Sequence, residues 1–416
     1  MKKIAFIVQR YGLEVNGGAE YHCRILAERL QSTYDIDILT TCSLEYLKWT
    51  NHYPAGATTV NGINVLRFPT AHPRMGKGFS TINRRLTRYA RAKRSKWSVW
   101  RDAAVRSLTG NSIASYSYLW AKYQGPFVPD LVRYLHENHA RYDVLIFFTY
   151  LYYPTIEGLT VAPHKSILIP TAHDEPPIYL PVFNNLFSLP KAILYNSLSE
   201  KRFVNRTFHN ESIYSSIVGV GVEAAEVDPH YPVAEVLGTD EPYLIYIGRI
   251  DTAKGCDVLF EYFIRYTASG SPALRLVLVG QAFMPVPDHP AIIPVGFVDE
   301  AVKISLLAGA KALVIPSLFE SLSMVTLESF AHGIPVIANG NCDVLNDHIE
   351  LSKGGVAYKN YPEFAQAVDR MLSQDSREMA QNARAYVAQR YTWDKVVANF
   401  STAVDYVMSH PKAGPG

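Results

Sequence analysis

The chain has 416 residues, 48% of them hydrophobic, and its formal net charge is only +2. This length is sufficient for two α/β domains with sizeable cores, and the near-neutral charge excludes a global attraction to nucleic acid. No run of 18 or more apolar residues occurs, so no transmembrane helix is expected. The N-terminal sequence MKKIAFIVQRYG is too short for a signal peptide and predicts a first parallel strand.

The cysteine pattern also indicates the cellular compartment of the protein. Cys23, Cys42, Cys256 and Cys342 lie far apart in the sequence and form no C-x-x-C pair. We therefore expect reduced, buried thiols in a cytoplasmic protein.

Strand and helix patterns alternate along nearly the whole chain. In the first half, apolar runs predict strands at residues 3–8, 36–40, 64–68, 144–148, 166–170 and 192–196, and helices at about 19–31 and after Ser199. A second set of strands is predicted at residues 243–247, 275–279, 291–295, 312–315 and 336–338. This alternation favours an α/β fold with two Rossmann-like, doubly wound parallel sheets.

A glycine-containing stretch near residues 219–223 interrupts the alternation and leads into a segment rich in proline and acids. We place the domain boundary there. The prediction is a first domain at residues 1–222, a second at 223–392, and a C-terminal helix with its tail at 393–416.

Two glutamates, Glu320 and Glu328, lie eight residues apart in the sequence PSLFESLSMVTLESFAHGIPVIANG. The pattern predicts that Glu320 lies in a short loop after strand 312–315 and that a helix begins after Ser323, its predicted N-cap. Glu328 then lies on the second turn, within about 12 Å of Glu320 by the helical rise. The amides and dipole of such a helix N-terminus suit a phosphate. One carboxylate can thus contact the sugar of a nucleotide sugar and the other its ribose.

Two cations follow the first strand of the second set. Arg249 comes directly after Gly248, and Lys254 precedes Gly255 at a predicted helix start. A guanidinium fork and an ammonium in this position can hold a diphosphate leaving group and offset the charge that develops on it.

Together, the E-x7-E pair and the G-R and K-G-x-D elements resemble the retaining glycosyltransferases of family 4 (glycosyl transferases group 1). The resemblance implies the GT-B fold, in which two Rossmann-like domains face each other and the last helix crosses back to the first domain. Within it, Glu320 would face the donor sugar, Glu328 would bind ribose hydroxyls, and Arg249 and Lys254 would hold the diphosphate. The chain departs from the family at Ser323, where a glycine is usual, and at Leu322, where a phenylalanine is usual.

The resemblance extends to further donor contacts. Those expected in the second domain are Gly248, Ser323, Met324 and Val325, with Phe297 and Val298 as candidates for contacts to the base. In the first domain they are Gly17 and Gly18, in a turn similar to the family's G-G-x-E turn over the diphosphate, and His173, which would touch the donor sugar. Asn196 and Ser197 resemble the family's serine-containing turn before a helix.

A basic segment at residues 74–106 stands out from the rest of the sequence. It contains a single acid, Asp102, and eleven basic residues: Arg74, Lys77, Arg84, Arg85, Arg88, Arg91, Lys93, Arg94, Lys96, Arg101 and Arg106. Tyr89, Trp97 and Trp100 are interleaved with them. A helix of this kind can lie on an anionic membrane surface or hold a phosphate-bearing acceptor, and the alternative is an exposed, salt-bridged helix. No motif supports nucleic acid as a partner.

No cofactor and no metal ion are expected. The Asp35-x-Asp37 pair lies at a strand start without a further acid or histidine nearby, and we interpret it as structural. Arg249 and Lys254 can supply the charge neutralisation that a divalent ion would otherwise provide.

The sequence thus predicts a retaining, metal-independent hexosyltransferase that moves a sugar from a UDP- or GDP-sugar to a glycan or lipid-linked acceptor, in cell-surface polysaccharide synthesis. We expect the protein in the cytoplasm. The basic segment extends this expectation to a peripheral position at the inner face of the membrane. The alternatives are a nucleotide-sugar epimerase or hydrolase of the same fold, and a nucleotide-sugar-binding protein without turnover.

Overall fold

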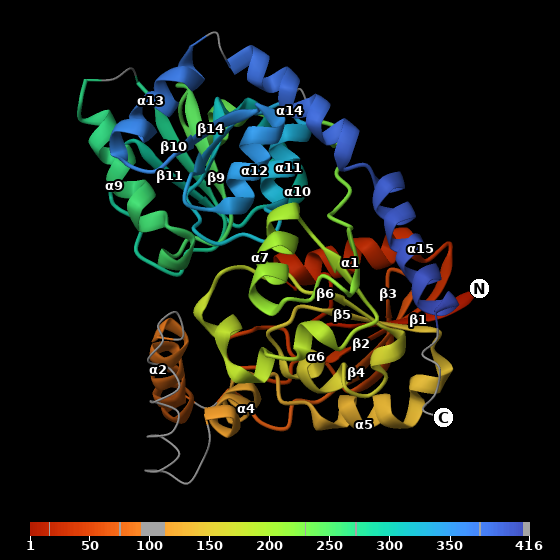
Figure 1. The fold of residues 1–416 in the computed structure, drawn as a ribbon. Coiled ribbons are helices and arrows are strands. Elements are labelled where there is room, and N and C mark those ends of the chain that lie inside the picture. Colours follow the sequence, from red (N-terminus) through yellow and green to blue (C-terminus); the bar gives the residue numbers. More distant parts are fainter. Residues whose placement is uncertain are drawn as a thin grey trace. The chain divides into compact units, whose positions relative to one another are not determined.

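The computed structural model describes residues 1–15, 17–74, 76–92, 113–228, 230–270, 273–373 and 376–410. The chain forms two compact units (Figure 1): the first unit comprises Met1–Gly219 with Val397–Gly416, and the second unit comprises Val220–Val396. The chain thus passes between the units three residues before and four residues after the two predicted boundaries.

The first unit contains an eight-stranded sheet. Its strands are β1 (Lys2–Ile7), β2 (Tyr34–Thr41), β3 (Gly56–Val60), β4 (Ile63–Phe68), β5 (Val144–Phe148), β6 (Ser166–Ile169), β7 (Ala192–Tyr195) and β8 (Tyr214–Ile217). Their order is β3-β4-β2-β1-β5-β6-β7-β8, and only the edge strand β3 runs antiparallel to its neighbour. Because the order reverses between β1 and β5, the loops after these two strands lie where such sheets bind their ligands.

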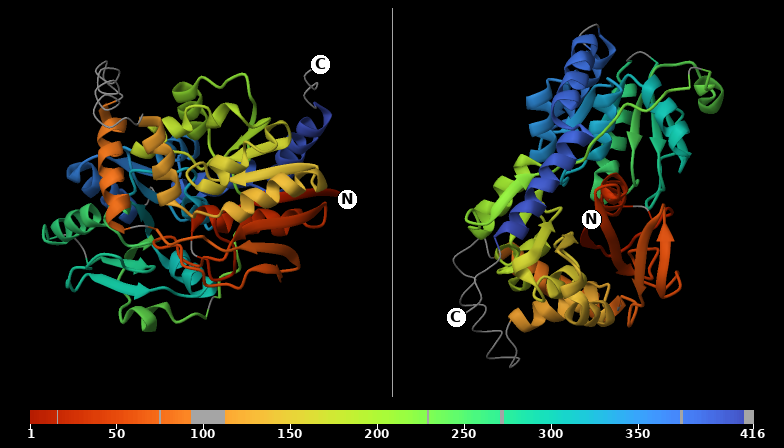
Figure 2. Two further views of the ribbon diagram at one scale, coloured as in Figure 1. Left: turned by 90° about the horizontal axis from the view of Figure 1, so that it is seen from below. Right: turned by 90° about the vertical axis from the view of Figure 1, so that its right-hand side faces the viewer.

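Helices cover both faces of this sheet. They are α1 (Gly18–Leu30), α2 (Gly76–Ala92), α4 (Ile113–Gln124), α5 (Pro129–Asn138), α6 (Tyr153–Gly158), α7 (Leu198–Phe208) and the greater part of α15 (Trp393–Ser409). Alternate strand residues point to opposite faces. Ala5 and Phe147 therefore join the core beneath α5 and α6, whereas Phe6 stacks on Phe400 of α15, and α1 lies on the same side (Figure 2).

The second unit has a six-stranded, fully parallel sheet. Its strands are β9 (Tyr243–Ile247), β10 (Arg275–Val279), β11 (Ile292–Gly296), β12 (Ala312–Ile315), β13 (Val336–Asn339) and β14 (Gly355–Tyr358). They follow the order β11-β10-β9-β12-β13-β14, so the switch point lies between β9 and β12. Its helices are α8 (Val233–Leu237), α9 (Cys256–Thr267), α10 (Glu300–Gly309), α11 (Met324–Ala331), α12 (Asp343–Ser352), α13 (Tyr361–Leu372) and α14 (Ser376–Arg390).

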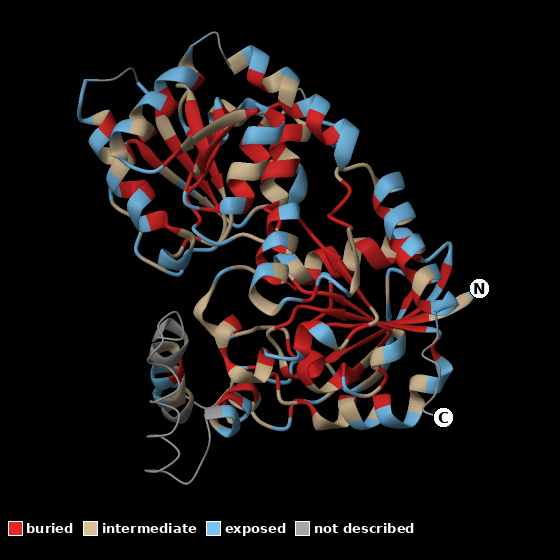
Figure 3. Ribbon diagram, in the orientation of Figure 1, coloured by how far each residue is buried: buried red, intermediate tan, exposed pale blue. Residues whose placement is uncertain are grey.

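The central strands of both sheets are buried along nearly their whole length, whereas the edge strands β3, β8, β11 and β14 are partly exposed and the helices expose one side to solvent (Figure 3). This explains why the strands appear in the sequence as continuous apolar runs. The predicted α/β fold with two doubly wound sheets is confirmed. All four cysteines are buried and free, and burial raises the pKa of each thiol.

Candidate active site

The switch point of the second sheet brings two loops together. The loop after β9 carries Arg249 and Lys254, and the loop after β12 carries Glu320. The two loops meet where Gly255 packs against Pro316. Residues that are some seventy positions apart in the sequence are therefore neighbours in space, at the edge of the sheet where parallel α/β folds bind their ligands.

Lys254 and Glu320 form the ion pair at this edge. The Lys254 ammonium lies 2.7 Å from Glu320 Oε1, and both side chains are partly exposed. Lys254 is at the end of a short 3₁₀ turn, Thr252–Lys254, which Asp251 caps: the Asp251 carboxylate accepts from Lys254 N–H at 2.8 Å. The loop backbone is thus fixed independently of the ammonium, which pairs with Glu320.

Arg249 is held by its own loop. Its guanidinium is paired with Asp251, and the buried Tyr246 hydroxyl donates to the Arg249 carbonyl at 2.7 Å. A rigid backbone under a charged head reduces the entropy lost when the guanidinium binds an anion. Tyr246 and Asp251 are supporting residues that sequence reasoning did not single out.

The loop after β12 leads into α11 through a left-handed residue. Ser323 has φ of +60°, and its hydroxyl contacts Thr326 Oγ1 at 2.8 Å instead of capping the first-turn amides. Ser323 thus occupies the predicted N-cap position without the predicted side-chain cap. A non-glycine residue in this region is strained, and the side chains of Met324 and Val325 are half-buried beside it. The uncapped amides at the start of α11 are of the kind that can bind an anion.

Glu328 has a partner that the sequence did not reveal. Its Oε2 accepts from the Lys303 ammonium of α10 at 2.9 Å, and Lys303 also lies 2.7 Å from Glu300. Burial raises the pKa of Glu328, and the charge of Lys303 opposes that shift. The carboxylate that we assigned to ribose is therefore supported by a fixed cation.

The two base-contact candidates stand apart from this cluster. Phe297 and Val298 follow the edge strand β11, and Phe297 is 70% exposed. A large apolar side chain with this exposure offers a flat face to a planar ligand.

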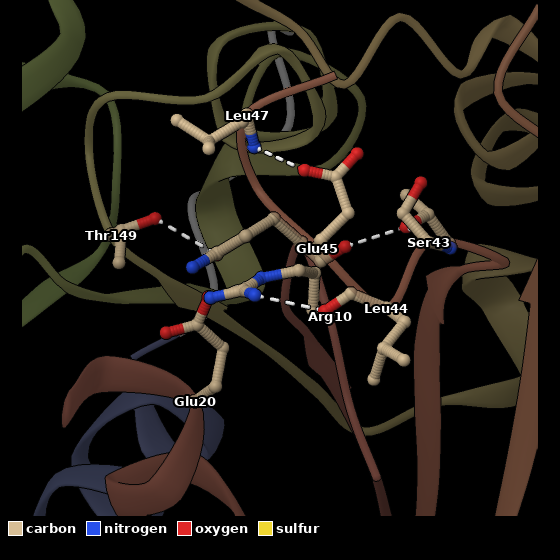
Figure 4. A network of polar contacts seen from close by, with 9 residues as sticks. Arg10, Glu20, Ser43, Leu44, Glu45, Leu47 and Thr149 are labelled. Carbon is tan, nitrogen blue, oxygen red and sulfur yellow. Dashed lines mark hydrogen bonds and ion pairs between the residues drawn. The ribbon is translucent and has the colours of Figure 1, made fainter. Parts of the chain in front are cut away.

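In the first unit, the glycine turn is supported by a buried ion pair (Figure 4). Arg10 follows β1 and donates from Nε to Glu20 Oε1 at 2.8 Å, while Nη1 donates to the Leu44 carbonyl at 2.9 Å. A β-carbon on Gly17 would lie 2.3 Å from Glu20 Oε2, whereas Gly18 faces open space. Gly17 is thus required by packing, and Arg10, which the sequence analysis overlooked, neutralises the carboxylate beneath the turn.

His173 lies in the loop after β6 beside a partly buried carboxylate, Glu175. Its Nε2 is 3.5 Å from Glu175 Oε1, and the Tyr150 hydroxyl donates to the same oxygen at 2.7 Å. Burial acts to raise the pKa of Glu175, but His173 and Tyr150 together lower it. His173, Glu175 and Tyr150 form one polar cluster at the carboxyl edge of the first sheet.

A buried carboxylate, Glu200, ties two loops to α7. It accepts from the backbone N–H of Ala172 at 2.5 Å and of Asn196 at 2.6 Å. Burial raises the pKa of Glu200 to about 8, against the effect of these backbone donors. The Ser197 hydroxyl caps the same helix by accepting from Glu200 N–H at 3.2 Å. The turn at Asn196 and Ser197 therefore fixes the backbone next to His173.

The backbone is strained at this edge as well. Thr149 after β5 has φ of +64° and Thr171 after β6 has φ of +50°. Such non-glycine residues cost about 1–3 kcal/mol each and gather at functional sites. Their positions on neighbouring strands, close to the reversal between β1 and β5, agree with a binding role for these loops.

The structure also bears on the expectations about metal ions, membrane-spanning helices and the basic segment. Among the described residues, no group of three His, Cys, Asp or Glu side chains could hold a metal ion, and no helix is long and apolar enough to cross a membrane. Asp37 accepts from Tyr142 at 2.9 Å and Asn64 at 2.8 Å, contacts of a structural kind. Asn16, and the side chains at 75–78 and 88–106 of the basic segment, lie outside the described residues. Within the described part of that segment, Arg84 and Arg85 are exposed.

Comparison with known proteins bears directly on the second unit. Residues 241–374 match the family model of glycosyl transferases group 1. Within the second unit, these residues form a glycosyl transferases group 1 domain. This domain spans the whole Lys254, Glu320 and Glu328 constellation, so the resemblance noted in the sequence is confirmed.

Relatives of the glycosyltransferase domain agree with this assignment. An uncharacterized glycosyltransferase of Methanocaldococcus jannaschii is 29% identical over 169 residues, which are 38% of this chain and 43% of that protein. The chain spans less than half the length of the curated relatives that it matches.

The fold likeness covers nearly the full length. Sucrose-phosphate synthase from Thermosynechococcus elongatus has a TM-score of 0.65 at 17% identity, over 98% of this chain and all of the other. Anabaena HepE, solved with UDP and glucose, has a TM-score of 0.66 at 15% identity over the same shares. The chain therefore has the GT-B fold, with the glycosyltransferase domain as its second unit.

Taken residue by residue, the structure brings together the predicted Arg249, Lys254 and Glu320 in the glycosyltransferase domain, and His173 has a cluster of its own in the first unit. The supporting residues that sequence reasoning missed are Arg10, Glu175, Glu200, Tyr246, Asp251 and Lys303. One signal was present for Glu200, because Ser197 and Glu200 have the S-x-x-E spacing of a capping box.

Proposed function

We propose that this protein transfers a sugar from a nucleoside diphosphate sugar to an acceptor hydroxyl, with retention of anomeric configuration and without a metal ion. The observation that carries the proposal is the Lys254–Glu320 ion pair, which lies at the switch point of a group 1 glycosyltransferase domain. A cation beside a carboxylate suits a ligand that has an anionic half and a hydroxyl-bearing half, because the cation pairs with the anion and the carboxylate accepts from the hydroxyls.

The chemistry follows from this arrangement. The bond between the anomeric carbon and the diphosphate oxygen breaks, and its electron pair stays on the diphosphate. Arg249 and Lys254 stabilise that charge, which is the usual largest contribution of an electrostatic site. The acceptor oxygen bonds to the anomeric carbon from the face that the leaving group occupied, and its proton passes to the departing phosphate.

Other residues position the donor. Glu320 accepts hydrogen bonds from sugar hydroxyls, and the amides at the start of α11 bind phosphate oxygens. Glu328, charged beside Lys303, accepts from the ribose hydroxyls. The first unit contributes the turn at Gly17 and Gly18 and the imidazole of His173. The donor is a UDP- or GDP-hexose, and UDP-glucose is the first choice because HepE of the same fold was solved with it.

The acceptor side is proposed on more general grounds. A glycan or a lipid-linked glycan fits an enzyme whose basic segment at 74–106 could approach anionic headgroups or phosphate. A role in cell-surface polysaccharide synthesis, at the cytoplasmic side of the membrane, is the corresponding biological proposal.

The test is product analysis with UDP- and GDP-hexoses and an added glycan as the acceptor, in the presence of EDTA. We expect one donor to raise the thermal midpoint by mass action and to be consumed slowly, with a product whose anomeric proton shows the α-configuration of the donor in NMR spectra. Glu320→Gln should bind that donor but turn it over about 100-fold more slowly, with exposed Glu350→Gln as the control. An epimerised sugar, an inverted product, inhibition by EDTA or binding without turnover would each contradict the proposal.

A further inference from the structure

His348 is a fully buried histidine on α12 that the proposed chemistry does not use. It is 2% exposed. Its Nε2 lies 2.7 Å from the Leu322 carbonyl oxygen, and its Nδ1 lies 3.0 Å from the Tyr386 hydroxyl of α14. Tyr386 in turn lies 3.3 Å from the Tyr391 hydroxyl. Four residues from three segments thus form one continuous chain of hydrogen bonds.

The chemistry of these groups fixes the direction of the chain. A carbonyl oxygen can only accept, so His348 must carry its proton on Nε2. Burial lowers the pKa of His348, which keeps the ring neutral and leaves Nδ1 as an acceptor for the Tyr386 hydroxyl. Because Tyr386 has then used its only proton, its oxygen accepts from Tyr391. Donation therefore runs from Tyr391 through Tyr386 and His348 to Leu322, and aligned bonds of this kind reinforce one another.

The acceptor end of the chain lies within the candidate active site. Leu322 is two residues after Glu320 and immediately before the strained Ser323. A bond to the Leu322 carbonyl restrains the peptide between Leu322 and Ser323, and so it holds both the loop that bears Glu320 and the start of α11. The strain at Ser323 persists only because its surroundings enforce it, and His348 is one of the groups that do so.

The donor end of the chain lies where the polypeptide passes between the units. The Tyr391 carbonyl accepts from Val222 N–H at 2.8 Å. Next to it, a β-carbon on Gly221 would lie 2.4 Å from Cδ2 of Trp393. The two connecting segments, one entering the second unit after Gly219 and one leaving it before Val397, are therefore packed side by side at Tyr391.

We propose that His348 is a positioning residue that holds the Glu320 loop in its productive geometry and, through Tyr386 and Tyr391, connects this loop to the paired segments that link the two units. The inference rests on the proposed function for its catalytic meaning. The inference goes beyond the proposed function because it assigns a role to residues that touch neither donor nor acceptor. A change in the linking segments reaches Glu320 by this route.

The test compares His348→Leu, His348→Gln and Tyr386→Phe with Tyr358→Phe. Tyr358 is a matched control, because its buried hydroxyl in the same unit has no hydrogen-bond partner among the described residues. Hydrogen exchange of peptides spanning residues 317–327 reports loop order without any need for turnover. We expect faster exchange there in His348→Leu and Tyr386→Phe, recovery in His348→Gln, whose amide can still donate to Leu322, and no change in Tyr358→Phe.

Kinetics separate positioning from folding. With the donor that the wild-type protein uses, His348→Leu should lower kcat by about 10- to 100-fold, as misplacement of a catalytic group by about 1 Å does, while KM for the donor changes less. His348→Gln should recover most of kcat. Unchanged exchange at 317–327 in His348→Leu would overturn the inference, and so would a variant that is less stable yet has wild-type kcat per folded molecule. A wild-type protein without sugar transfer would instead refute the proposed function, and the exchange measurements would still decide the role of His348.

Discussion

A β-carbon on Gly255 would lie only 2.6 Å from the carbonyl oxygen of Pro316. The two residues belong to the loops after β9 and β12, which contribute Lys254 and Glu320. Gly255 also has φ of +76°, a conformation that side chains disfavour. Backbone contact at this point therefore sets how closely the cationic loop and the carboxylate loop approach each other.

Replacing Gly255 by alanine should push these loops apart. We expect Gly255→Ala to destabilise the second unit by about 1–3 kcal/mol and to reduce kcat/KM for the donor by about 10-fold or more. Gly238→Ala is the control, since Gly238 also has positive φ but has nothing within 4 Å of its β-carbon position. Thermal unfolding and steady-state kinetics measure the two effects. Equal kcat/KM in the two variants would show that the contact with Pro316 is unimportant.

Removing the ammonium of Lys254 should slow the chemical step. Lys254→Met keeps the length of the side chain and leaves the Asp251 cap of the turn in place, so the loop should retain its fold. We expect kcat to fall by about 100- to 1,000-fold, because a charge aimed at the leaving group is lost. The comparison is exposed Lys311→Met, measured with the same donor. A loss confined to KM would mean that Lys254 only binds the ground state.

Glu328 should determine recognition of the ribose. We expect the wild-type protein to bind a nucleoside diphosphate about 10- to 100-fold more tightly than its 2′,3′-dideoxy form, as hydrogen bonds to a charged group are worth about 1.5–3 kcal/mol. Glu328→Gln should lose most of this preference. Glu300→Gln is the matched control, because Glu300 pairs with the same Lys303 but is largely exposed. Titration calorimetry gives the affinity of each of the three proteins for each of the two ligands, and an undiminished preference in Glu328→Gln would assign the ribose contact to another residue.

Acid should destabilise the first unit through His22. Burial lowers the pKa of His22 from 6.5 to about 3. The unfolded chain therefore binds a proton that the folded protein excludes as pH falls below 6.5. The contribution of the neutral His22 ring to the free energy of unfolding is complete above pH 6.5. As the pH falls from 6.5 to about 3, this contribution decreases by at most about 1.4 kcal/mol per pH unit. Urea unfolding between pH 7 and pH 4 should show a shallower decrease in His22→Gln than in the wild type or in exposed His52→Gln.

The sequence was sufficient for the inner strands of the two sheets, whereas the edge strands β8 and β14 were not predicted. The strands Val144–Phe148, Tyr243–Ile247 and Arg275–Val279 lie where they were predicted, because a strand buried on both faces must be apolar throughout. The edge strand Gly56–Val60 was missed. Most of its residues are exposed, and it pairs through a hairpin with β4, so no apolar pattern marks it.

The supporting residues of the site could not be predicted, for a different reason. Lys303 lies 25 positions from Glu328, and Glu200 lies 28 positions from the Ala172 amide that it accepts from. A charged residue on a helix has the same local pattern whether it faces solvent or a buried partner. Only the packing of helices onto the sheet decides between these outcomes, whereas Arg249 and Lys254 were recognisable because they follow a strand end directly.

The burial of all four thiols gives the protein a practical advantage for labelling. A single cysteine introduced on the exposed surface of each unit would react with a maleimide dye or spin label, while the raised pKa values and inaccessibility of the native thiols keep them silent. Distances between such probes would follow the separation of the two units in solution, with and without a nucleotide sugar, in a protein whose natural sequence is otherwise unchanged.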